Sequence, residues 1–237
     1  ILLLGRYLGE MLVKEGKAHA EDVLDIFLRM EQIGAYVRYV AHEVTGDIRG
    51  IERVKKRVAE SKTSVPIQAN AQGQILSDQK VYGLWGLFSV PARVSGLLPE
   101  GSLGLSLEAR HFVETQYTKT LEPALNDLSR LLLKGGNLNL NRSHPIMKCL
   151  AKVLDEKCTA DETAFYGDYL RDGSYMKSEV SGRQKNLRLL IEKSEKFEQM
   201  LDREEIRKLA QESHQTDPVL SRSLEEIDHL EAFIVPA

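Results

Sequence analysis

The sequence predicts a mainly α-helical protein, a multi-helix bundle with long heptad-patterned helices and one small mixed module. Three observations support this prediction. Apolar residues recur at intervals of three and four along much of the chain, helix start and stop signals are frequent, and strand-like runs are few and short. With 237 residues, of which 42% are hydrophobic, the chain can bury one large core or two small ones.

Two long helices are expected, because two stretches place apolar residues at alternating steps of three and four. The first covers residues 20–44, and its apolar positions are Val23, Ile26, Met30, Ile33, Val37, Val40 and Val44. The second lies in a highly charged run, with Leu187, Leu190, Ser194, Phe197 and Leu201 on one face. A seam of this kind has to pack against another helix, within the chain or in a second copy.

Shorter helices are predicted from their start and stop signals. Proline at a first helical position opens the segments 123–134 and 145–157, and the first of these ends at a pair of glycines. A Thr-Ala-Asp-Glu capping box opens a helix over 159–172, and an Asp-Pro pair opens a last one over 218–235.

Strand signals occur only at 64–67, 74–76 and 103–105, all close to one central segment, and an asparagine-rich loop follows at 134–145. We therefore expect three parts. They are N-terminal helices including a basic helix at 1–63, a small mixed module at 64–121, and a C-terminal helical domain at 122–237.

The central module has a recognisable order of elements. A capping Ser-Asp leads into "QKVYGLWGLF", a Ser-Val-Pro turn leads into "ARVSGLL", and a "PEGS" turn and a strand-like "LGL" precede the helix "SLEARHFVETQY". This order resembles a winged helix-turn-helix, in which the second helix enters the DNA major groove and the hairpin forms a wing. The helical spacing of Tyr82, Trp85 and Phe88 predicts a buried aromatic face.

The resemblance implies a set of nucleic-acid contacts. Arg93 and Ser95 would lie on the exposed side of the second helix, with Lys80 in the helix before it. A neighbouring segment, 47–62, holds six basic residues against three acidic ones and would add a positive surface. Its outward cations are Arg49, Arg53, Lys56 and Arg57.

A protein-binding module explains the same pattern. Residues 65–121 carry four basic and four acidic side chains, so this segment alone is neutral, whereas DNA-binding surfaces neutralise several phosphates. The basic segment also fits an ordinary solvated helix face.

No catalytic signature is found. The six histidines have no metal-ligand spacing, and no phosphate-binding loop or nucleophile elbow occurs, so the sequence predicts no catalytic residue, no metal and no cofactor. Two cysteines, Cys149 and Cys158, fit a reducing cytoplasm. The apolar runs are too short for a membrane span, the start makes a poor signal peptide, and a chain that begins at Ile1 is expected to be part of a longer one.

These observations predict a non-catalytic, cytoplasmic binding or scaffold subunit. Its expected partner is another protein or a second copy, held through the heptad helices, with double-stranded DNA as a further expected ligand. Helical segments around a "YGLWGLFSVPARVSGLL" corner also resemble uncharacterised bacterial subunits of multi-gene defence or DNA-processing complexes. The alternative from another class is an enzyme or nuclease subunit whose site is built from dispersed carboxylates and lysines.

Overall fold

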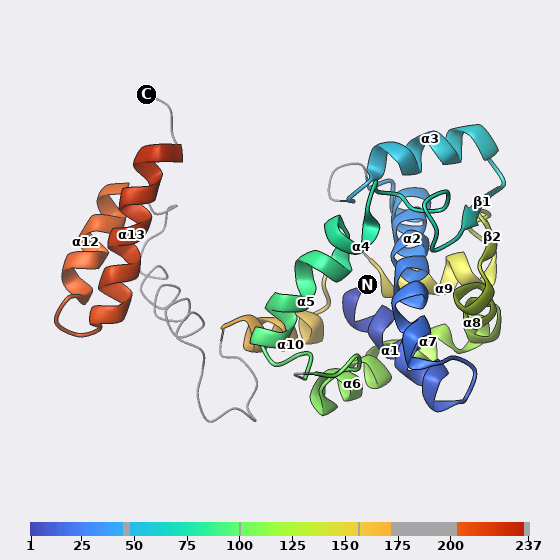
Figure 1. Cartoon of the computed structure of the whole chain (residues 1–237), viewed down its shortest axis with the longest axis horizontal. Coiled ribbons are helices and arrows are strands. Elements are labelled where there is room, and N and C mark those ends of the chain that lie inside the picture. The colour runs from blue at the N-terminus through green and yellow to red at the C-terminus, as the bar shows by residue number, and fades with distance from the viewer. Residues whose placement is uncertain (45–47, 100, 156, 172–202, 235–237) are drawn as a thin grey trace. The chain divides into compact units, whose positions relative to one another are not determined.

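The computed structural model describes residues 1–44, 48–99, 101–155, 157–171 and 203–234, and most of them are helical (Figure 1). This confirms the predicted mainly α-helical fold class. The contacts divide the chain into two compact units, residues 1–165 and 166–237.

The helices and strands follow one another in this order. The first unit contains α1 (Leu2–Lys14), η1 (Ala20–Asp22), α2 (Val23–His42), α3 (Ile51–Ser61), β1 (Ser64–Ile67), α4 (Gln79–Tyr82), α5 (Leu84–Val94), α6 (Leu107–Val113), the π-helical turn η2 (Glu114–Thr118), α7 (Lys119–Leu121), η3 (Glu122–Ala124), α8 (Leu125–Lys134), β2 (Gly136–Asn139) and α9 (Pro145–Val153). Helix α10 (Ala160–Arg171) spans the division, and the second unit contains α12 (Arg203–Ser213) and α13 (Pro218–Ile234).

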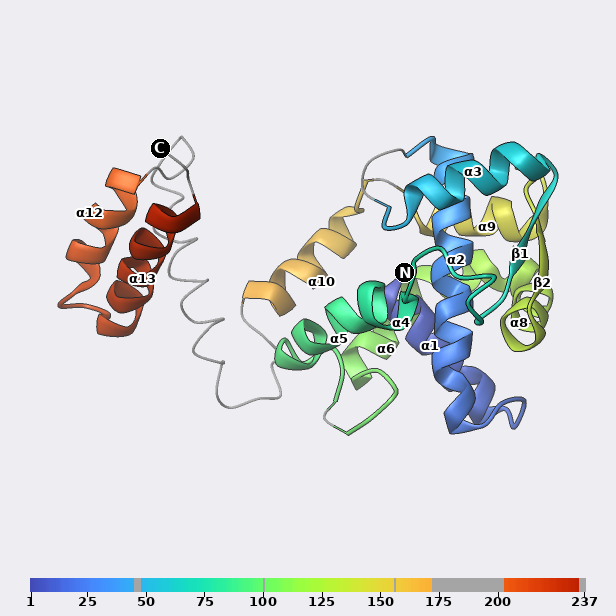
Figure 2. The ribbon, with the colours of Figure 1, turned by 45° about the horizontal axis from the view of Figure 1, so that its top comes forward.

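Helix α2 is the central helix of the first unit, as Figures 1 and 2 show from two directions. It packs against α1, α3, α8 and α9. Its predicted heptad residues Ile26, Met30, Ile33 and Val37 are fully buried. The first predicted heptad helix is therefore confirmed, and its seam is used within the chain.

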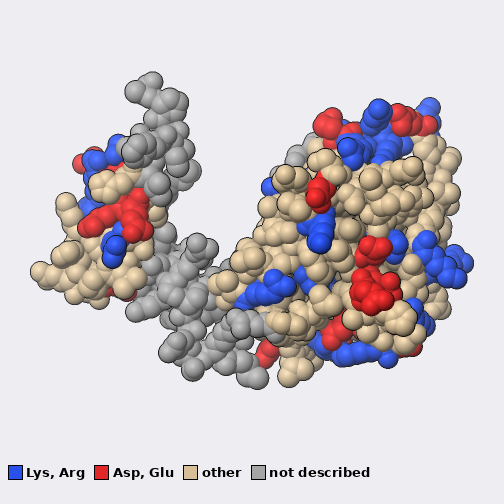
Figure 3. Space-filling model, in the orientation of Figure 1, with Lys and Arg blue, Asp and Glu red and all other residues tan. Residues whose placement is uncertain are grey.

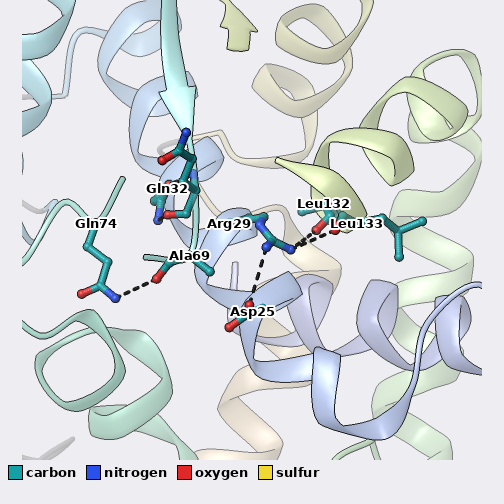
Figure 4. Close-up of polar contacts among 8 residues, drawn as sticks. Asp25, Arg29, Gln32, Ala69, Gln74, Leu132 and Leu133 are labelled. Atoms are coloured by element: carbon teal, nitrogen blue, oxygen red, sulfur yellow. Dashed lines mark hydrogen bonds and ion pairs between the residues drawn. The ribbon is translucent and has the colours of Figure 1, made fainter. Parts of the chain in front are cut away.

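Polar side chains of α2 fix the segments around it (Figure 4). The Arg29 guanidinium donates to the carbonyls of Leu132 and Leu133 at the end of α8, at 2.7 and 3.2 Å. The Gln32 side chain bonds both backbone groups of Gln68, donating to its carbonyl at 2.8 Å and accepting from its N–H at 3.1 Å. The last carbonyls of a helix and the backbone groups of a loop have no partner within a helix or strand, and these side chains supply one.

Strands β1 and β2 form an antiparallel pair, with Ser64 opposite Asn139 and Ile67 opposite Gly136. The strand expected at 64–67 is confirmed, and β2 lies where an asparagine-rich loop was expected. This pair joins residues on both sides of position 121 within the first unit, and the three-part division stays a prediction.

The helix-turn-helix expected in the central module is not formed as predicted. Helix α5 continues through Pro91, so the second helix expected from Ala92 is only its last turn. Pro91 is exposed, so water can satisfy the carbonyl that the missing N–H leaves free. The helix instead ends after Val94, and Gly96 with a φ of +85° turns the chain away. The Leu98 N–H donates to the Ala92 carbonyl at 3.0 Å, which satisfies a carbonyl of the last helical turn.

Two other elements of the expected module also differ. Residues 74–76 and 103–105 are described and are not strands, so the expected wing hairpin does not form. The stretch 91–106 is a tight corner closed by a bond from the Ser106 N–H to the Leu97 carbonyl.

In the second unit, helices α12 and α13 pack along each other. Leu209, Ala210, Leu220 and Leu224 form its buried core. The Asp228 carboxylate accepts hydrogen bonds from two arginines of α12. The second heptad stretch, 187–201, lies outside the described residues.

Candidate binding surface

Helix α5 presents several of its large apolar side chains to solvent. Leu87, Val90 and Val94 recur at intervals of three and four residues and form one exposed stripe, in which Val90 is 62% exposed. The buried positions of the same helix are Ser89 and Ala92, both small. The usual distribution of residues is therefore reversed on this helix.

The stripe belongs to a larger exposed apolar area, which we call the α5 surface. It includes the end of α4, the turn before α6 and the first residue of α6, and its members are Val81, Tyr82, Leu87, Phe88, Val90, Val94, Leu103 and Leu107. In Figure 3, the part of the first unit that carries α5 is mostly tan, with more blue than red among it. The expected buried aromatic face is wrong at two of its positions, because Tyr82 is 55% and Phe88 is 47% exposed.

A buried arginine holds α5 from beneath. The Arg6 guanidinium is fully buried, lies 3.4 Å from the centroid of the Trp85 ring, and donates to the Ser89 hydroxyl at 2.7 Å and to the Leu103 carbonyl at 3.2 Å. Burial, and secondarily the charge of Arg93, lower the pKa of Arg6 to about 10. Arg6 thus connects α1, α5 and the turn at Leu103.

A buried carboxylate holds the other end of the helix. Glu31 of α2 accepts the Leu84 N–H at 2.7 Å and the Gln79 side-chain amide at 2.8 Å. It therefore caps the first turn of α5 from outside the helix. Burial is the largest effect on Glu31 and raises the pKa of its carboxyl group. A side chain at Gly83 would collide with this carboxylate, since an added Cβ would lie 2.7 Å from its oxygens.

Helix α5 and the end of α4 carry charges of one sign only. Residues 79–99 contain Lys80 and Arg93 and no acidic residue. Neither cation makes a hydrogen bond or ion pair within the part of the chain that the structure describes. Arg6 beneath them also has no carboxylate partner there, so helix α5 itself is cationic, whereas Asp78 and Glu108 flank the α5 surface in the sequence.

The structure uses most of the other predicted nucleic-acid residues for local contacts. Ser95 is buried, and its hydroxyl donates to the Ala92 carbonyl. Arg53 donates to the carbonyls of Gln74 and Leu76 at 2.9 and 3.1 Å. Arg57 donates to the three successive carbonyls of residues 72–74.

The two remaining predicted residues of the basic segment are more exposed. Arg49 makes a long hydrogen bond of 3.4 Å to the Tyr82 carbonyl, and Lys56 lies 3.9 Å from the Glu60 carboxylate. Figure 3 shows blue and red side chains intermixed over α3. Within the described ranges, the structure thus separates Lys80 and Arg93, which have no such partner there, from the arginines that hold the loop beside α3.

The other expected kinds of site can also be located. Among the described residues, no group of three histidine, cysteine or acidic side chains is placed to hold a metal ion. Cys149 is buried and Cys158 is exposed, both as free thiols. No helix within the described ranges is both long and apolar enough to cross a membrane.

Comparisons with protein-family models, with curated proteins and with solved structures found no match. The site therefore has to be interpreted from its own geometry.

The exposed stripe of α5 was missed at the sequence level. The spacing of Leu87, Val90 and Val94 is visible in the sequence, but residues 81–92 are apolar on every side of a helix. Periodicity then cannot indicate which face is buried. The signal that decides it is the buried Arg6, which selects the face that carries Trp85 and Ser89.

Proposed function

We propose that this protein is a non-catalytic, protein-binding scaffold module whose α5 surface holds an amphipathic helix of a partner protein. The observation that carries the proposal is the reversal on α5, where Ser89 and Ala92 are buried and Leu87, Val90 and Val94 are exposed. Water-exposed apolar side chains of this size lose the stabilisation that burial provides, about 1.5–3 kcal/mol each. Contiguous exposed apolar areas of this kind mark interaction sites.

The geometry favours a helix as the bound element. The stripe repeats at intervals of three and four residues, which is the spacing that pairs with another helix. The surface is also fixed in place, because Glu31 holds the first turn of α5 and Arg6 holds its middle. A rigid surface loses little conformational entropy on binding.

Charge decides the chemistry of the partner. A second copy of α5 would bring Arg93 against a cation in either orientation, because residues 79–99 contain Lys80 and Arg93 and no carboxylate. The nearest carboxylates in the sequence, Asp78 and Glu100, lie just outside this stretch. A partner helix with an apolar face and acidic residues at both ends would instead complement the surface. The 11 residues of α5 extend over about 16 Å, so such a helix needs about three to four turns.

The test uses a fluorescein-labelled amphipathic peptide of about 15 residues, with leucines at helical spacing and glutamates at both ends. We expect fluorescence anisotropy to show saturable binding with a Kd of about 100 µM or tighter, and Val90→Asp to weaken it at least about tenfold. The matched control is Val219→Asp, because Val219 is 57% exposed and belongs to α13 of the second unit. Equal effects of the two substitutions would overturn the proposal.

Double-stranded DNA stays a prediction and is an outcome of the same experiment. A labelled duplex is titrated at several salt concentrations, with Lys80→Ala/Arg93→Ala alongside the unchanged protein. Binding that falls steeply with salt and is lost in the double variant would support a nucleic-acid surface in place of the helix site. The part played by this chain in a bacterial defence or DNA-processing complex is likewise a prediction that neither titration addresses.

A further inference from the structure

A cavity of about 160 Å³ lies beside the first turns of α5, between that helix and α2. Its apolar lining includes Ile48, Ile75 and Phe88. Two arginines and one acidic residue, Arg38, Arg49 and Glu31, also line it, and so does Ile1. Mostly apolar walls with a few polar groups are the usual composition of a small-molecule site.

The carboxylate of this cavity is already engaged. Glu31 accepts the Leu84 N–H and the Gln79 amide, at 2.7 and 2.8 Å. It is 3% exposed, and it does not form an ion pair with either arginine at 4.0 Å or less among the described residues.

The two arginines, in contrast, have unused donors. The Nε of Arg38 is buried without a hydrogen-bond partner, and its guanidinium makes no ion pair within the described ranges. Arg49 has one bond, 3.4 Å long, to the Tyr82 carbonyl. Arg38 and Arg49 both line the cavity, and within the described residues their guanidinium groups keep donors that an entering acceptor can use. A hydrogen bond to a charged group contributes about 1.5–3 kcal/mol.

Guanidinium groups select the chemistry of the ligand. Their planar donors match a carboxylate, and such charge-assisted bonds are about twice as strong as neutral ones. The volume limits the rest of the molecule, because an apolar protein cavity of about 150 Å³ holds one benzene ring. A nucleotide is therefore too large for this space.

We propose that this cavity binds a small carboxylic acid whose apolar body is about the size of a benzene ring. The carboxylate bonds Arg38 and Arg49, and the body lies against Ile48, Ile75 and Phe88. The site is separate from the α5 surface apart from Phe88, which contributes to both. Its test uses neither the Val90 substitution nor the peptide, so the two proposals can fail independently.

The probe is phenylacetate, titrated into the full chain by isothermal titration calorimetry at low ionic strength. We expect saturable binding with a Kd of about 1 mM or tighter. Phenylacetamide has the same shape without the negative charge and is expected to bind at least about tenfold more weakly. Absence of saturable binding of phenylacetate, or equal affinity for both compounds, would overturn the proposal.

Three variants locate the site. Arg49→Gln and Arg38→Gln are each expected to weaken phenylacetate binding at least about tenfold. Lys56→Gln removes the same charge from the adjacent helix α3, outside the cavity lining, and is expected to leave the affinity unchanged. Because Arg49 is exposed, its variant keeps the test decisive if Arg38→Gln impairs folding. Equal loss in the Lys56 and Arg49 variants would show charge attraction without a site.

Discussion

Arg57 of the basic helix is expected to stabilise the fold through the loop beside it, and Arg57→Met tests this directly. Its guanidinium donates to the carbonyls of Gln72, Gly73 and Gln74 at 2.5, 2.6 and 3.2 Å, and to the Tyr36 hydroxyl at 3.3 Å. Methionine keeps an unbranched apolar stem of similar packing and removes all four bonds.

The expected cost is about 2 kcal/mol of unfolding free energy. A hydrogen bond to a charged group contributes about 1.5–3 kcal/mol when buried. The bond to Gln72 is exposed, and the bonds to Gly73 and Gln74 are partly buried, so water replaces a share of each. The free energies of hydrogen bonds from one guanidinium are not additive, so the total loss is expected to lie near that of one well-buried bond.

Urea unfolding followed by tryptophan fluorescence measures this cost. Trp85 is the single tryptophan and lies in the first unit, so the signal reports that unit alone. With a slope of about 2 kcal/mol per M, Arg57→Met lowers the midpoint by about 1 M. Lys56→Met, one residue away and paired only at 3.9 Å with Glu60, is expected to shift the midpoint by less than about 0.3 M. Equal shifts for the two variants would refute the structural role of Arg57.

Three further substitutions test other parts of the account. Gly50→Ala is expected to lower the free energy of unfolding by about 3 kcal/mol, because φ is +76° and a Cβ would lie 2.4 Å from the Ile75 carbonyl oxygen. Gly16→Ala has a similar φ of +68° but open space around it, so it is expected to cost about 1 kcal/mol. The urea midpoints of the two variants measure the difference. Pro91→Ala restores a helical N–H and is expected to raise the midpoint, and a lowered midpoint contradicts this. The stability of Glu31→Gln relative to the unchanged protein is expected to increase as the pH is raised from about 4 to about 7.

The sign of the Glu31 prediction follows from its raised pKa. A carboxyl group whose folded-state pKa lies above its ordinary value of 4.5 favours folding in the protonated form. That contribution is complete below about pH 4.5 and is lost as the pH rises through the folded-state value. Glutamine does not titrate, so the difference between the two proteins changes with pH. A difference that is constant with pH would contradict the assignment.

The long helices were predictable because their signals are local. The apolar spacing of residues 23–37 and the prolines at 123, 145 and 218 indicate helices at positions where the structure has them. The strand at 64–67 was also predictable, but its partner at 136–139 was not. Pairing over such a separation depends on the helices between the strands, which bring Val65 and Leu138 into the same core.

The binding surface depends on long-range contacts that no local pattern contains. Pro91 looks like a helix boundary in the sequence, yet its exposed position allows α5 to continue. Arg53 and Arg57 look like free surface charge, but loop carbonyls 15–23 residues further along the chain accept their hydrogen bonds. The orientation of α5 is determined by Arg6, which lies 83 residues before its partner Ser89.

Reversing the charges of the α5 surface tests the central proposal most directly. Two labelled amphipathic peptides with the same leucine face, one ending in glutamates and the other in lysines, are titrated into the unchanged protein and into Lys80→Glu/Arg93→Glu. We predict that the unchanged protein binds the glutamate-ended peptide at least about fivefold more tightly, and that the double variant prefers the lysine-ended peptide. The same preference in both proteins, or binding of neither peptide, would contradict a cationic helix-binding surface on α5.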